Sequence, residues 1–409
     1  MPSLRCTGRW LLERMRILFH HRIGSKDGQF VHIEALTRAL EKQGHEIFIV
    51  GPRGTGRQHF GGESSRIAWL KRKMPGAFYE LLELGYSIPA YFRLARAIRR
   101  RHPDVIYERY NLFFPAGIIA KRRFKLPLLL EVNAPLFEER QRYGGLRLKG
   151  LARWSEHFTW RGADAVFVVT DVLGDVVRQS GVPPHNVVIT PNGVDAAAYE
   201  EPERGKALRR MLGLENTVVL GFVGFAREWH GLEKIVDLLA RQPRGNLHFL
   251  LVGHGPACPI ISARAESLGV KDKVTITGVV EHAQVPDYVM AFDVALQPSV
   301  VPYASPLKLF EYLAAGCAVV APNSANIREI LTHEHDALLF SQLEGGGFAA
   351  AIQRLLADPA LRKRLGAQAK ATVRERGLSW AGNARTVIRV AETLIRQKGK
   401  DVVVRGARK

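Results

Sequence analysis

Short apolar runs alternate with amphipathic stretches through most of the chain. The first repeat has an apolar run at residues 16–20, a loop with Gly24 and Gly28, a helical stretch that stops at Gly44, and a second apolar run at 46–50. Glycine just past the last helical residue is a common stop signal. We therefore expect a strand, a loop, a helix and a second strand here. The pattern recurs in the first half of the chain, with apolar runs at 104–107, 127–132, 163–169 and 187–189.

A second block with the same alternation opens at residue 217, after the charged segment 192–214. Its apolar runs lie at 217–223, 247–252, 273–276, 293–296 and 318–320. Short apolar strands that alternate with helices are typical of a parallel sheet covered by helices on both faces. The pattern predicts an α/β protein with two doubly wound domains in tandem. Ligands of such domains bind at the carboxyl ends of the strands.

The composition is that of a folded globular protein rather than a disordered or fibrous one. Of the 409 residues, 46% are hydrophobic and 24% are charged. No apolar segment reaches the ~18 residues that a membrane-spanning helix needs, and residues 1–14 lack the apolar core of a signal peptide. Cys6, Cys258 and Cys317 lie too far apart for a metal knuckle or a disulfide framework. We expect a cytoplasmic protein.

The positive charge is concentrated in the first half of the chain. The net charge is +20, and residues 1–190 carry 31 Lys and Arg against 17 Asp and Glu. Aromatic residues lie between the basic runs at 71–73, 99–101 and 121–123, and interfacial helices combine these residue types. Two interpretations stay open, a solvated surface or a peripheral site for an anionic membrane. Nucleic acid is less favoured because no nucleic-acid motif accompanies the charge.

Several common signatures of nucleotide and metal chemistry are absent from the sequence. It contains no GxxxxGK[ST] phosphate loop and no Asp-x-Asp pair, the usual carboxylate pair for a metal-held nucleotide sugar. His333 and His335 form a close histidine pair, and we interpret them as part of a solvated loop because no third ligand lies beside them. The sequence therefore predicts neither a metal site nor a bound cofactor.

The strongest local signal for chemistry is the stretch 303–322. Pro306 suits the first turn of a helix, where its missing N–H costs nothing, and the free N–H groups of Leu307 and Lys308 would form an anion site. Lys308 adds a point charge for a phosphate. Glu311 lies one turn further on the same face and can accept hydrogen bonds from sugar hydroxyls. The alternative is a structural Lys308–Glu311 pair on a charge-balanced helix.

In this stretch the sequence resembles the family-4 glycosyltransferases of the GT-B fold. That family carries two glutamates eight positions apart; the second binds the nucleotide ribose and the first touches the donor sugar. Glu311 matches the second, whereas Tyr303 occupies the position of the first. The Ser-Pro-Leu-Lys sequence before Glu311 looks like a known subset of the family, and the resemblance implies that Lys308 joins the diphosphate site.

The segment 223–231 is similar to the family's diphosphate-binding loop. Gly224 lies at its turn, the usual Arg position holds Phe225, and the usual Lys position holds His230. The resemblance implies that Arg227, which lies between these two positions, is the phosphate clamp. It also implies that His230 acts there as a neutral donor or a partial cation.

Other loops extend the resemblance over most of the chain. Gly24 and Gly28 lie where the family has a glycine-rich loop near the donor phosphates and the acceptor. Residues 191–195 are similar to the family's interdomain link. Gly253 matches a glycine that packs a strand–helix turn, and Val279 lies where backbone groups contact the base.

In the first half, the segment 130–135 looks like one branch of the same family. Many relatives carry a histidine near the position of Asn133 that meets the donor sugar, and this chain has Asn133 beside Glu131 instead. Either residue could contact sugar at a strand end, and both are candidate catalytic residues. The alternative for Glu131 is a salt-bridged structural carboxylate. For His32, contact with the acceptor and plain helix surface both stay open.

The resemblance implies two Rossmann-like domains that face each other across a cleft, with a C-terminal helix that crosses back. We expect Met15 to begin the ordered chain, and either Met1 or Met15 could be the native start. The expected parts are a disordered extension at 1–14, an acceptor-side domain at 15–193, a nucleotide-sugar-binding domain at 194–378, a crossing helix at 379–398 and a basic tail at 399–409.

The implied activity is transfer of a sugar from a nucleoside-diphosphate sugar to an acceptor hydroxyl, with retention of configuration and without a metal. The expected partners are the nucleotide-sugar donor, which is a co-substrate rather than a cofactor, and a glycan or lipid-linked acceptor of polysaccharide or glycolipid synthesis. An anionic membrane surface is a further candidate partner. The alternative is a non-catalytic basic protein that docks on membrane or nucleic acid with a degenerate GT-B scaffold.

Overall fold

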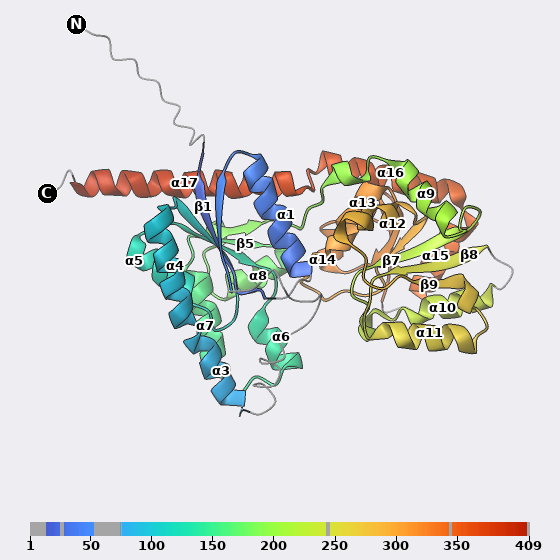
Figure 1. The fold of residues 1–409 in the computed structure, drawn as a ribbon, viewed down its shortest axis with the longest axis horizontal. Coiled ribbons are helices and arrows are strands. Elements are labelled where there is room, and N and C mark those ends of the chain that lie inside the picture. The colour runs from blue at the N-terminus through green and yellow to red at the C-terminus, as the bar shows by residue number, and fades with distance from the viewer. Residues whose placement is uncertain are drawn as a thin grey trace, which may run out of the picture. The chain divides into compact units, whose positions relative to one another are not determined.

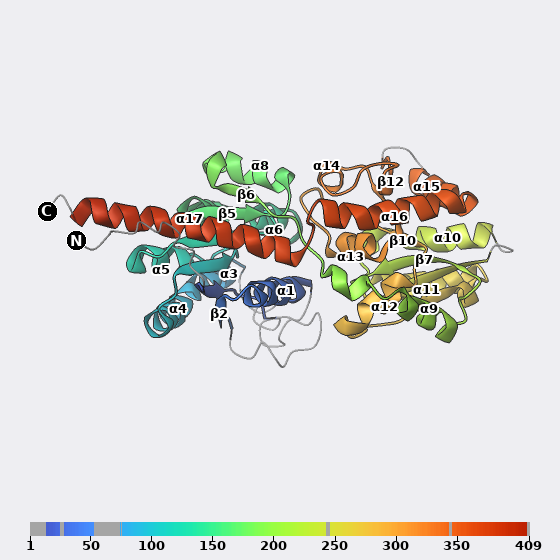
Figure 2. The ribbon, with the colours of Figure 1, turned by 90° about the horizontal axis from the view of Figure 1, so that it is seen from above.

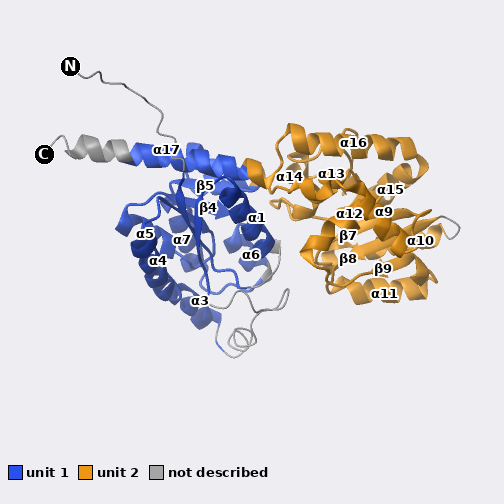
Figure 3. Cartoon of the chain, turned by 45° about the horizontal axis from the view of Figure 1, so that its top comes forward, with its two compact units in different colours: residues 1–169, 173–190, 383–409 blue, residues 170–172, 191–382 orange. Residues whose placement is uncertain are grey.

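The chain folds into two compact units, coloured separately in Figure 3. Unit 1 holds residues 1–169, 173–190 and 383–409, and unit 2 holds residues 170–172 and 191–382. The computed structural model describes residues 14–24, 28–52, 74, 76–242, 246–342 and 346–406. The predicted extension up to residue 13, the basic run 71–73 and the last three residues of the expected tail lie outside the described residues.

Unit 1 contains a six-stranded parallel sheet in the order β2-β1-β3-β4-β5-β6, and the predicted apolar runs of the first half form its strands (Figure 1). The strands are β1 (Arg16–His20), β2 (Glu46–Val50), β3 (Val105–Arg109), β4 (Leu128–Val132), β5 (Ala165–Val168) and β6 (Val187–Ile189). All side chains of β3, β4 and β5 are buried. This burial explains why most of their residues are apolar, since helices cover both faces of such a sheet, and the buried charged residues among them are Glu108, Arg109 and Glu131.

The helices of unit 1 connect these strands. They are α1 (Gly28–Lys42), α3 (Gly76–Gly85), α4 (Ser87–Arg101), α5 (Ala116–Phe124), α6 (Leu136–Tyr143), α7 (Lys149–Gly162), α8 (Asp171–Gln179) and the 3₁₀ turn η1 (Pro184–Asn186). Helix α5 begins only at Ala116, although the segment from Leu112 onward is also apolar. Phe113 has a left-handed φ of 59°, and a residue before a proline, here Phe114, avoids the helical region.

Unit 2 contains a second six-stranded parallel sheet, in the order β12-β11-β10-β7-β8-β9. Its strands are β7 (Val218–Val223), β8 (Leu247–Val252), β9 (Val274–Ile276), β10 (Val294–Leu296), β11 (Ala318–Pro322) and β12 (Ala337–Phe340). The apolar runs predicted five of them, and β12 was not predicted. Together the two sheets confirm the predicted class, an α/β chain with two doubly wound, Rossmann-like domains.

Helices lie on both faces of this second sheet and bury two apolar layers, one led by Phe310 and Val319 and the other by Phe249 and Ile235. The helices are α9 (Pro202–Met211), α10 (Glu233–Arg241), α11 (Ala257–Ser267), α12 (Val285–Met290), α13 (Leu307–Ala315), α14 (Ala325–Arg328), α15 (Gly347–Ala357) and α16 (Pro359–Glu375). Short 3₁₀ turns are η2 (Ala196–Tyr199), η3 (Glu228–His230), η4 (Lys271–Lys273) and η5 (His282–Gln284).

The last helix, α17 (Trp380–Gly406), begins in unit 2 and belongs to unit 1 from residue 383 onward (Figures 2 and 3). Ala384, Val387 and Ala391 on this helix are buried. Lys398 Nζ lies 3.4 Å from Asp164 Oδ2 of unit 1. Among the described residues, no helix is long and apolar enough to cross a membrane.

The strand orders place a switch point in each sheet. In unit 2 the central strand β7 has β8 on one side and β10 on the other, so the connections leave its end in opposite directions. In unit 1 the same holds for β1 between β2 and β3. Ligands of open α/β sheets bind outside the carboxyl ends of the strands at such points. The candidate residues of both halves follow these strands.

Candidate active site

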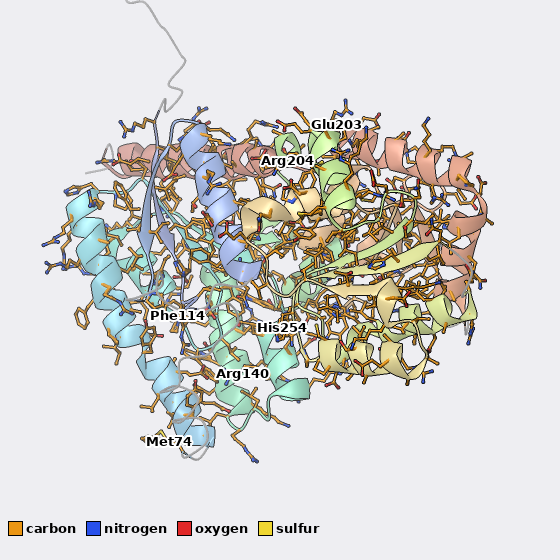
Figure 4. All side chains as sticks on the ribbon, turned by 45° about the vertical axis from the view of Figure 1, so that its right-hand side comes forward. Met74, Phe114, Arg140, Glu203, Arg204 and His254 are labelled. Atoms are coloured by element: carbon orange, nitrogen blue, oxygen red, sulfur yellow. The ribbon has the colours of Figure 1, made fainter. Side chains whose placement is uncertain are left out.

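Two glycine-containing loops meet at the carboxyl end of β7 and β8. Gly224 follows β7 with a φ of 122°, and Gly253 follows β8 with a φ of 137°. A Cβ atom on Gly253 would lie 2.2 Å from the Gly224 carbonyl oxygen, so only glycine permits this approach. The Ala226 N–H also donates to the carbonyl of His254, which is labelled in Figure 4. The two loops therefore form one connected floor.

The start of α13 lies beside this floor. Pro306 caps the helix with a ψ of 122°. The Leu309 N–H donates to the Pro306 carbonyl at 3.1 Å, whereas the N–H groups of Leu307 and Lys308 have no intrahelical acceptors. Lys308 Nζ lies 3.6 Å from the centroid of the Phe222 ring, and 3.5 Å from where a Gly224 Cβ would be. Free N–H groups, the helix dipole and an amine therefore converge on one small anion-binding region.

Lys308 and Glu311 are half-buried, and neither forms a hydrogen bond or ion pair with any residue the structure describes. The structural pair considered from the sequence is therefore not formed. Burial lowers the pKa of Lys308 to about 7, although the Glu311 carboxylate opposes the shift. Burial likewise raises the pKa of Glu311 to about 7, opposed by Lys308. Within the described part of the chain, neither group therefore has a hydrogen-bond or ion-pair partner that would offset its burial.

His230 is the buried residue of the loop after β7. Its Nδ1 accepts a hydrogen bond of 3.0 Å from the Arg227 N–H, which leaves the ring proton on Nε2. Burial, together with the Lys308 amine, lowers the pKa of His230 to about 3. This shift favours a neutral ring, and the role of His230 at the diphosphate stays a prediction. Arg227 itself is exposed, with its guanidinium carbon 5.1 Å from the centroid of the Phe225 ring.

The predicted base contact lies on the loop after β9. Gly278 and Gly253 form an isolated bridge, and the Gly253 N–H donates to Thr277 Oγ1 at 3.3 Å. These contacts join the loop to the floor described above. Val279, the next residue, is 57% exposed.

Two buried asparagines fix the loop that leads into α13, and sequence reasoning missed both. Asn192 Nδ2 donates to the Ser305 carbonyl at 2.5 Å. Asn326 Nδ2 donates to the Ala304 carbonyl at 2.7 Å and to the Val301 carbonyl at 3.2 Å. Tyr312 adds a third anchor, since its hydroxyl accepts from the Val223 N–H at 3.0 Å. The position of the α13 N-terminus is therefore fixed by contacts within unit 2.

Glu131 is the centre of a separate polar cluster in unit 1. Its two oxygens accept hydrogen bonds from Tyr107 Oη (2.9 Å), Arg109 Nη1 and Asn133 Nδ2 (2.5 Å), and His32 Nε2 lies 3.2 Å away. Burial alone would raise the pKa of Glu131, but His32, Arg109 and these hydrogen bonds hold it well below its ordinary value. The geometry is that of the salt-bridged carboxylate considered from the sequence, with Asn133 and His32 as its partners.

A second buried pair lies on the neighbouring strands of unit 1. His20 Nδ1 is 2.5 Å from Glu108 Oε2, and the His20 ring stacks on Phe114, labelled in Figure 4. A Cβ on Gly117 would lie 2.0 Å from Glu108 Oε2, so this glycine makes room for the carboxylate. Sequence reasoning did not single out His20 or Glu108, although charged residues at the end of a buried strand were a usable signal.

The structure groups the candidate residues by unit. In unit 2 it brings Gly224, His230, Gly253 and Lys308 together around one floor. In unit 1, Glu131 and Asn133 are hydrogen-bonded neighbours, Gly24 ends the described loop after β1, and Gly28 is the first residue of α1. Across the described ranges, no group of three or more His, Cys, Asp or Glu could hold a metal ion.

Family models match both halves of the chain. Residues 27–193 match the model described as "Glycosyl transferase 4-like domain". Residues 217–358 match the model described as "Glycosyl transferases group 1". The first matched segment contains β2 to β6 but not β1, and the second contains β7 to β12 with the loop after β7 and all of α13.

Curated glycosyltransferases are also similar to this chain in sequence. The D-inositol 3-phosphate glycosyltransferase of Kineococcus radiotolerans is 28% identical over 331 residues, which cover 74% of this chain and 74% of that enzyme. The alpha-D-kanosaminyltransferase of Streptomyces kanamyceticus is 25% identical over 221 residues. This second match spans only 53% of this chain and 57% of the relative.

Among solved structures, the chain is similar to Anabaena HepE in complex with UDP. The TM-score is 0.70 at 19% sequence identity, and the match covers 93% of this chain and 99% of that one. At this identity the likeness concerns the fold. Both halves of the chain therefore share an overall fold with a structure that was solved with a nucleoside diphosphate.

Proposed function

Because the chain belongs to the family-4 glycosyltransferases of the GT-B fold, we propose that it transfers a sugar from a nucleoside-diphosphate sugar to an acceptor hydroxyl with retention of configuration. The observation that carries the donor assignment is the anion-binding region at Gly224 and the α13 N-terminus, where Lys308 has no hydrogen-bond or ion-pair partner among the described residues. A diphosphate supplies the missing negative charge.

The same residues support a metal-free reaction. As the glycosidic bond breaks, negative charge develops on the leaving diphosphate, and preorganised N–H groups and cations stabilise it without reorganisation. Lys308 and the first turn of α13 lie at this site, and Arg227 is on the adjacent exposed loop. In this proposal a leaving phosphate oxygen takes the proton of the acceptor hydroxyl on the same face of the sugar, which gives retention.

Glu311 supports recognition of the nucleoside. It lies one helical turn beyond Lys308, is half-buried and has no protein hydrogen bond within the described chain. A ribose diol would supply the missing donors. The relative solved with UDP makes uridine the first base to test. For the acceptor we propose a glycan or lipid-linked hydroxyl of polysaccharide or glycolipid synthesis, because unit 1 is basic and presents exposed aromatic residues.

The test is a thermal-shift panel of UDP, GDP, ADP and their common sugars, each with and without EDTA. A ligand that binds only the folded state stabilises it by about 2.7 kcal/mol at a hundredfold excess over Kd, and the melting temperature rises as a result. A shift with one diphosphate that survives EDTA is the expected result. The anomeric configuration of the transferred sugar is then read by NMR of the product.

Three outcomes would each contradict part of the proposal. A shift that EDTA abolishes and Mn²⁺ restores would reject the metal-free reaction. No shift with any nucleotide would favour the non-catalytic scaffold instead. Inversion of the anomeric centre in the product would reject retention while leaving the donor assignment intact.

A further inference from the structure

Helices α3 and α4 of unit 1 form one nearly continuous helix along a flank of the unit (Figure 1). Tyr86 between them has helical backbone angles, φ −60° and ψ −20°. Its N–H donates to the Leu82 carbonyl at 2.9 Å, and its own carbonyl accepts from the Ala90 N–H at 3.2 Å. Pro89 has no N–H to offer the Gly85 carbonyl, which explains the assigned break. The helical period therefore runs on from residue 76 to residue 101.

The outer side of this helix carries large apolar side chains at helical spacing. Phe78, Leu81 and Leu82 of α3 are exposed, and Ile88 and Phe92 of α4 are 63% and 65% exposed. The buried side of α4 instead uses small or aliphatic residues. Most other large apolar residues of the described chain are buried. An exposed apolar row of this length marks a contact surface rather than scattered surface residues.

The same row becomes basic toward the end of α4. Arg96, Arg99 and Arg100 are exposed at the spacing that continues from Phe92. Helix α5, which lies beside α4 (Figure 2), adds Arg122 and Arg123, and both are exposed. Neither α4 nor α5 contains an acidic residue. None of these five arginines forms an ion pair with a residue in the described ranges.

Aromatic rings support these arginines in place of carboxylates. The guanidinium of Arg99 lies 5.5 Å from the centroid of the Phe124 ring, and that of Arg122 lies 4.9 Å from the Phe158 ring. Phe158 in turn stacks on Trp154 of α7, which is half exposed. Guanidinium groups held this way keep their charge available to an anion. The basic surface therefore runs from α4 over α5 to α7.

We propose that this surface docks unit 1 on an anionic lipid bilayer. We call it the docking face: the apolar row Phe78, Leu81, Leu82, Ile88 and Phe92, with the arginines Arg96, Arg99, Arg100, Arg122 and Arg123. Interfacial helices bury such apolar rows at the acyl boundary while basic residues contact lipid phosphates. A nucleic acid would use the arginines but would leave the aliphatic row in water. A second copy of the chain would bring like charges together.

The test is co-sedimentation with vesicles of phosphatidylcholine that contain 30% phosphatidylglycerol, compared with vesicles of pure phosphatidylcholine. The wild-type chain binds only the anionic vesicles. Each basic residue near such a surface contributes about fivefold to binding, so Arg96→Gln, Arg99→Gln and Arg100→Gln together reduce the affinity about 100-fold. Ile88→Ser with Phe92→Ser reduces it about tenfold or more, because the lost contacts are apolar.

The matched control removes the same charge from unit 2. Arg210, Lys363 and Arg374 are exposed there and form no ion pair with a described residue. Replacing all three by glutamine leaves vesicle binding within about threefold of wild type. Equal loss in both triple variants would show a mere net-charge effect and overturn the docking face. Failure of the wild type to bind anionic vesicles would also overturn it.

Two further measurements separate the remaining outcomes. If a 20-base-pair DNA duplex binds more tightly than the vesicles and the α4 triple variant loses this binding, the face serves nucleic acid and the proposal is wrong. The variant Lys308→Ala, altered only in unit 2, binds vesicles like wild type. Vesicle binding and sugar transfer are thereby tested separately, because each can be lost in a variant that keeps the other.

Discussion

Both sheets carry charged residues at their carboxyl ends, but in the described part of the chain only those of unit 1 are paired with other side chains. In unit 1, Glu131 is surrounded by Arg109, His32 and two neutral donors. In unit 2, Lys308 and Glu311 have no hydrogen-bond or ion-pair partner among the described residues. One edge is internally neutralised, whereas the other retains unpaired charge in a half-buried place.

From this difference we infer that the charged residues of unit 1 stabilise the fold and that those of unit 2 bind a ligand. A buried ion pair with satisfied hydrogen bonds is strongly destabilised when one partner is removed. A half-buried charge without a partner gives the folded protein little stability, and an arriving opposite charge relieves its desolvation. We therefore expect substitutions in unit 1 to lower the free energy of unfolding and substitutions in unit 2 to lower turnover.

The largest expected effect is that of Glu131→Ala. It leaves the buried Arg109 and His32 without their common partner, which lowers the free energy of unfolding by about 3–5 kcal/mol. Urea unfolding monitored by circular dichroism measures this change. The control Glu138→Ala, at an exposed site of α6, changes stability by no more than about 0.5 kcal/mol. A loss for Glu131→Ala as small as the control's would remove the contrast between the two edges.

The second effect is that of Lys308→Ala on turnover. Loss of one charge-stabilising group at a developing anion lowers the rate about 10²-fold or more, and Glu311→Ala should act similarly. The free energy of unfolding changes little, because the Lys308 amine loses no hydrogen bond or ion pair with a described residue and only its contact with the Phe222 ring. The rate is measured on purified protein with the donor found by thermal shift, and Lys363→Ala serves as the exposed control. Wild-type turnover in folded Lys308→Ala would sink the site assignment.

The third and smallest effect concerns Glu156, a carboxylate of unit 1 with only neutral partners. Its Oε2 accepts from Tyr110 Oη at 2.8 Å and from the Phe137 N–H at 3.1 Å, and burial raises its pKa to about 7. A carboxyl whose folded pKa is raised holds its proton in the folded state, so stability falls as pH rises from about 4.5 through 7.

Glu156→Gln removes this dependence, since the amide stays neutral and its oxygen can accept both hydrogen bonds. Compared with wild type, the variant should be about 2 kcal/mol more stable at pH 8 and nearly equal at pH 5. Urea unfolding at the two pH values measures the difference. If the two proteins were equally stable at pH 8, ionisation of Glu156 would not lower the free energy of unfolding. Glu156 would then not differ in this respect from Glu131, whose charge is neutralised.

The sequence predicted the sheets well because each strand is a local apolar run. Ala337–Phe340 was missed although all four of its residues are apolar, because the run is short and follows the polar loop with His333. The unit 2 site was also readable, because Pro306, Lys308 and Glu311 lie within one short stretch. A helix start needs only neighbouring residues to define an anion site.

The environment of Glu131 could not be read in the same way. Its partner Arg109 comes from the adjacent strand through the β3–β4 register, and His32 comes from α1. A carboxylate in a sequence carries no sign of which distant cations will neutralise it. The anchors Asn192 and Asn326 were missed for the same reason, because both act on backbone carbonyls far away in the sequence.

Helix α17 has a consequence for how the chain is made. Unit 1 includes residues 383–409 as well as residues before 190, and Val387 and Ala391 of the late segment are buried. A ribosome that adds 5–20 residues per second takes roughly 10–40 s to synthesise the intervening residues of unit 2. Unit 1 is therefore the first unit to emerge and the last to be completed. Until α17 has been synthesised, the surface of unit 1 that this helix covers stays exposed. A truncated chain that ends at residue 190 would keep unit 1 in that unfinished state permanently.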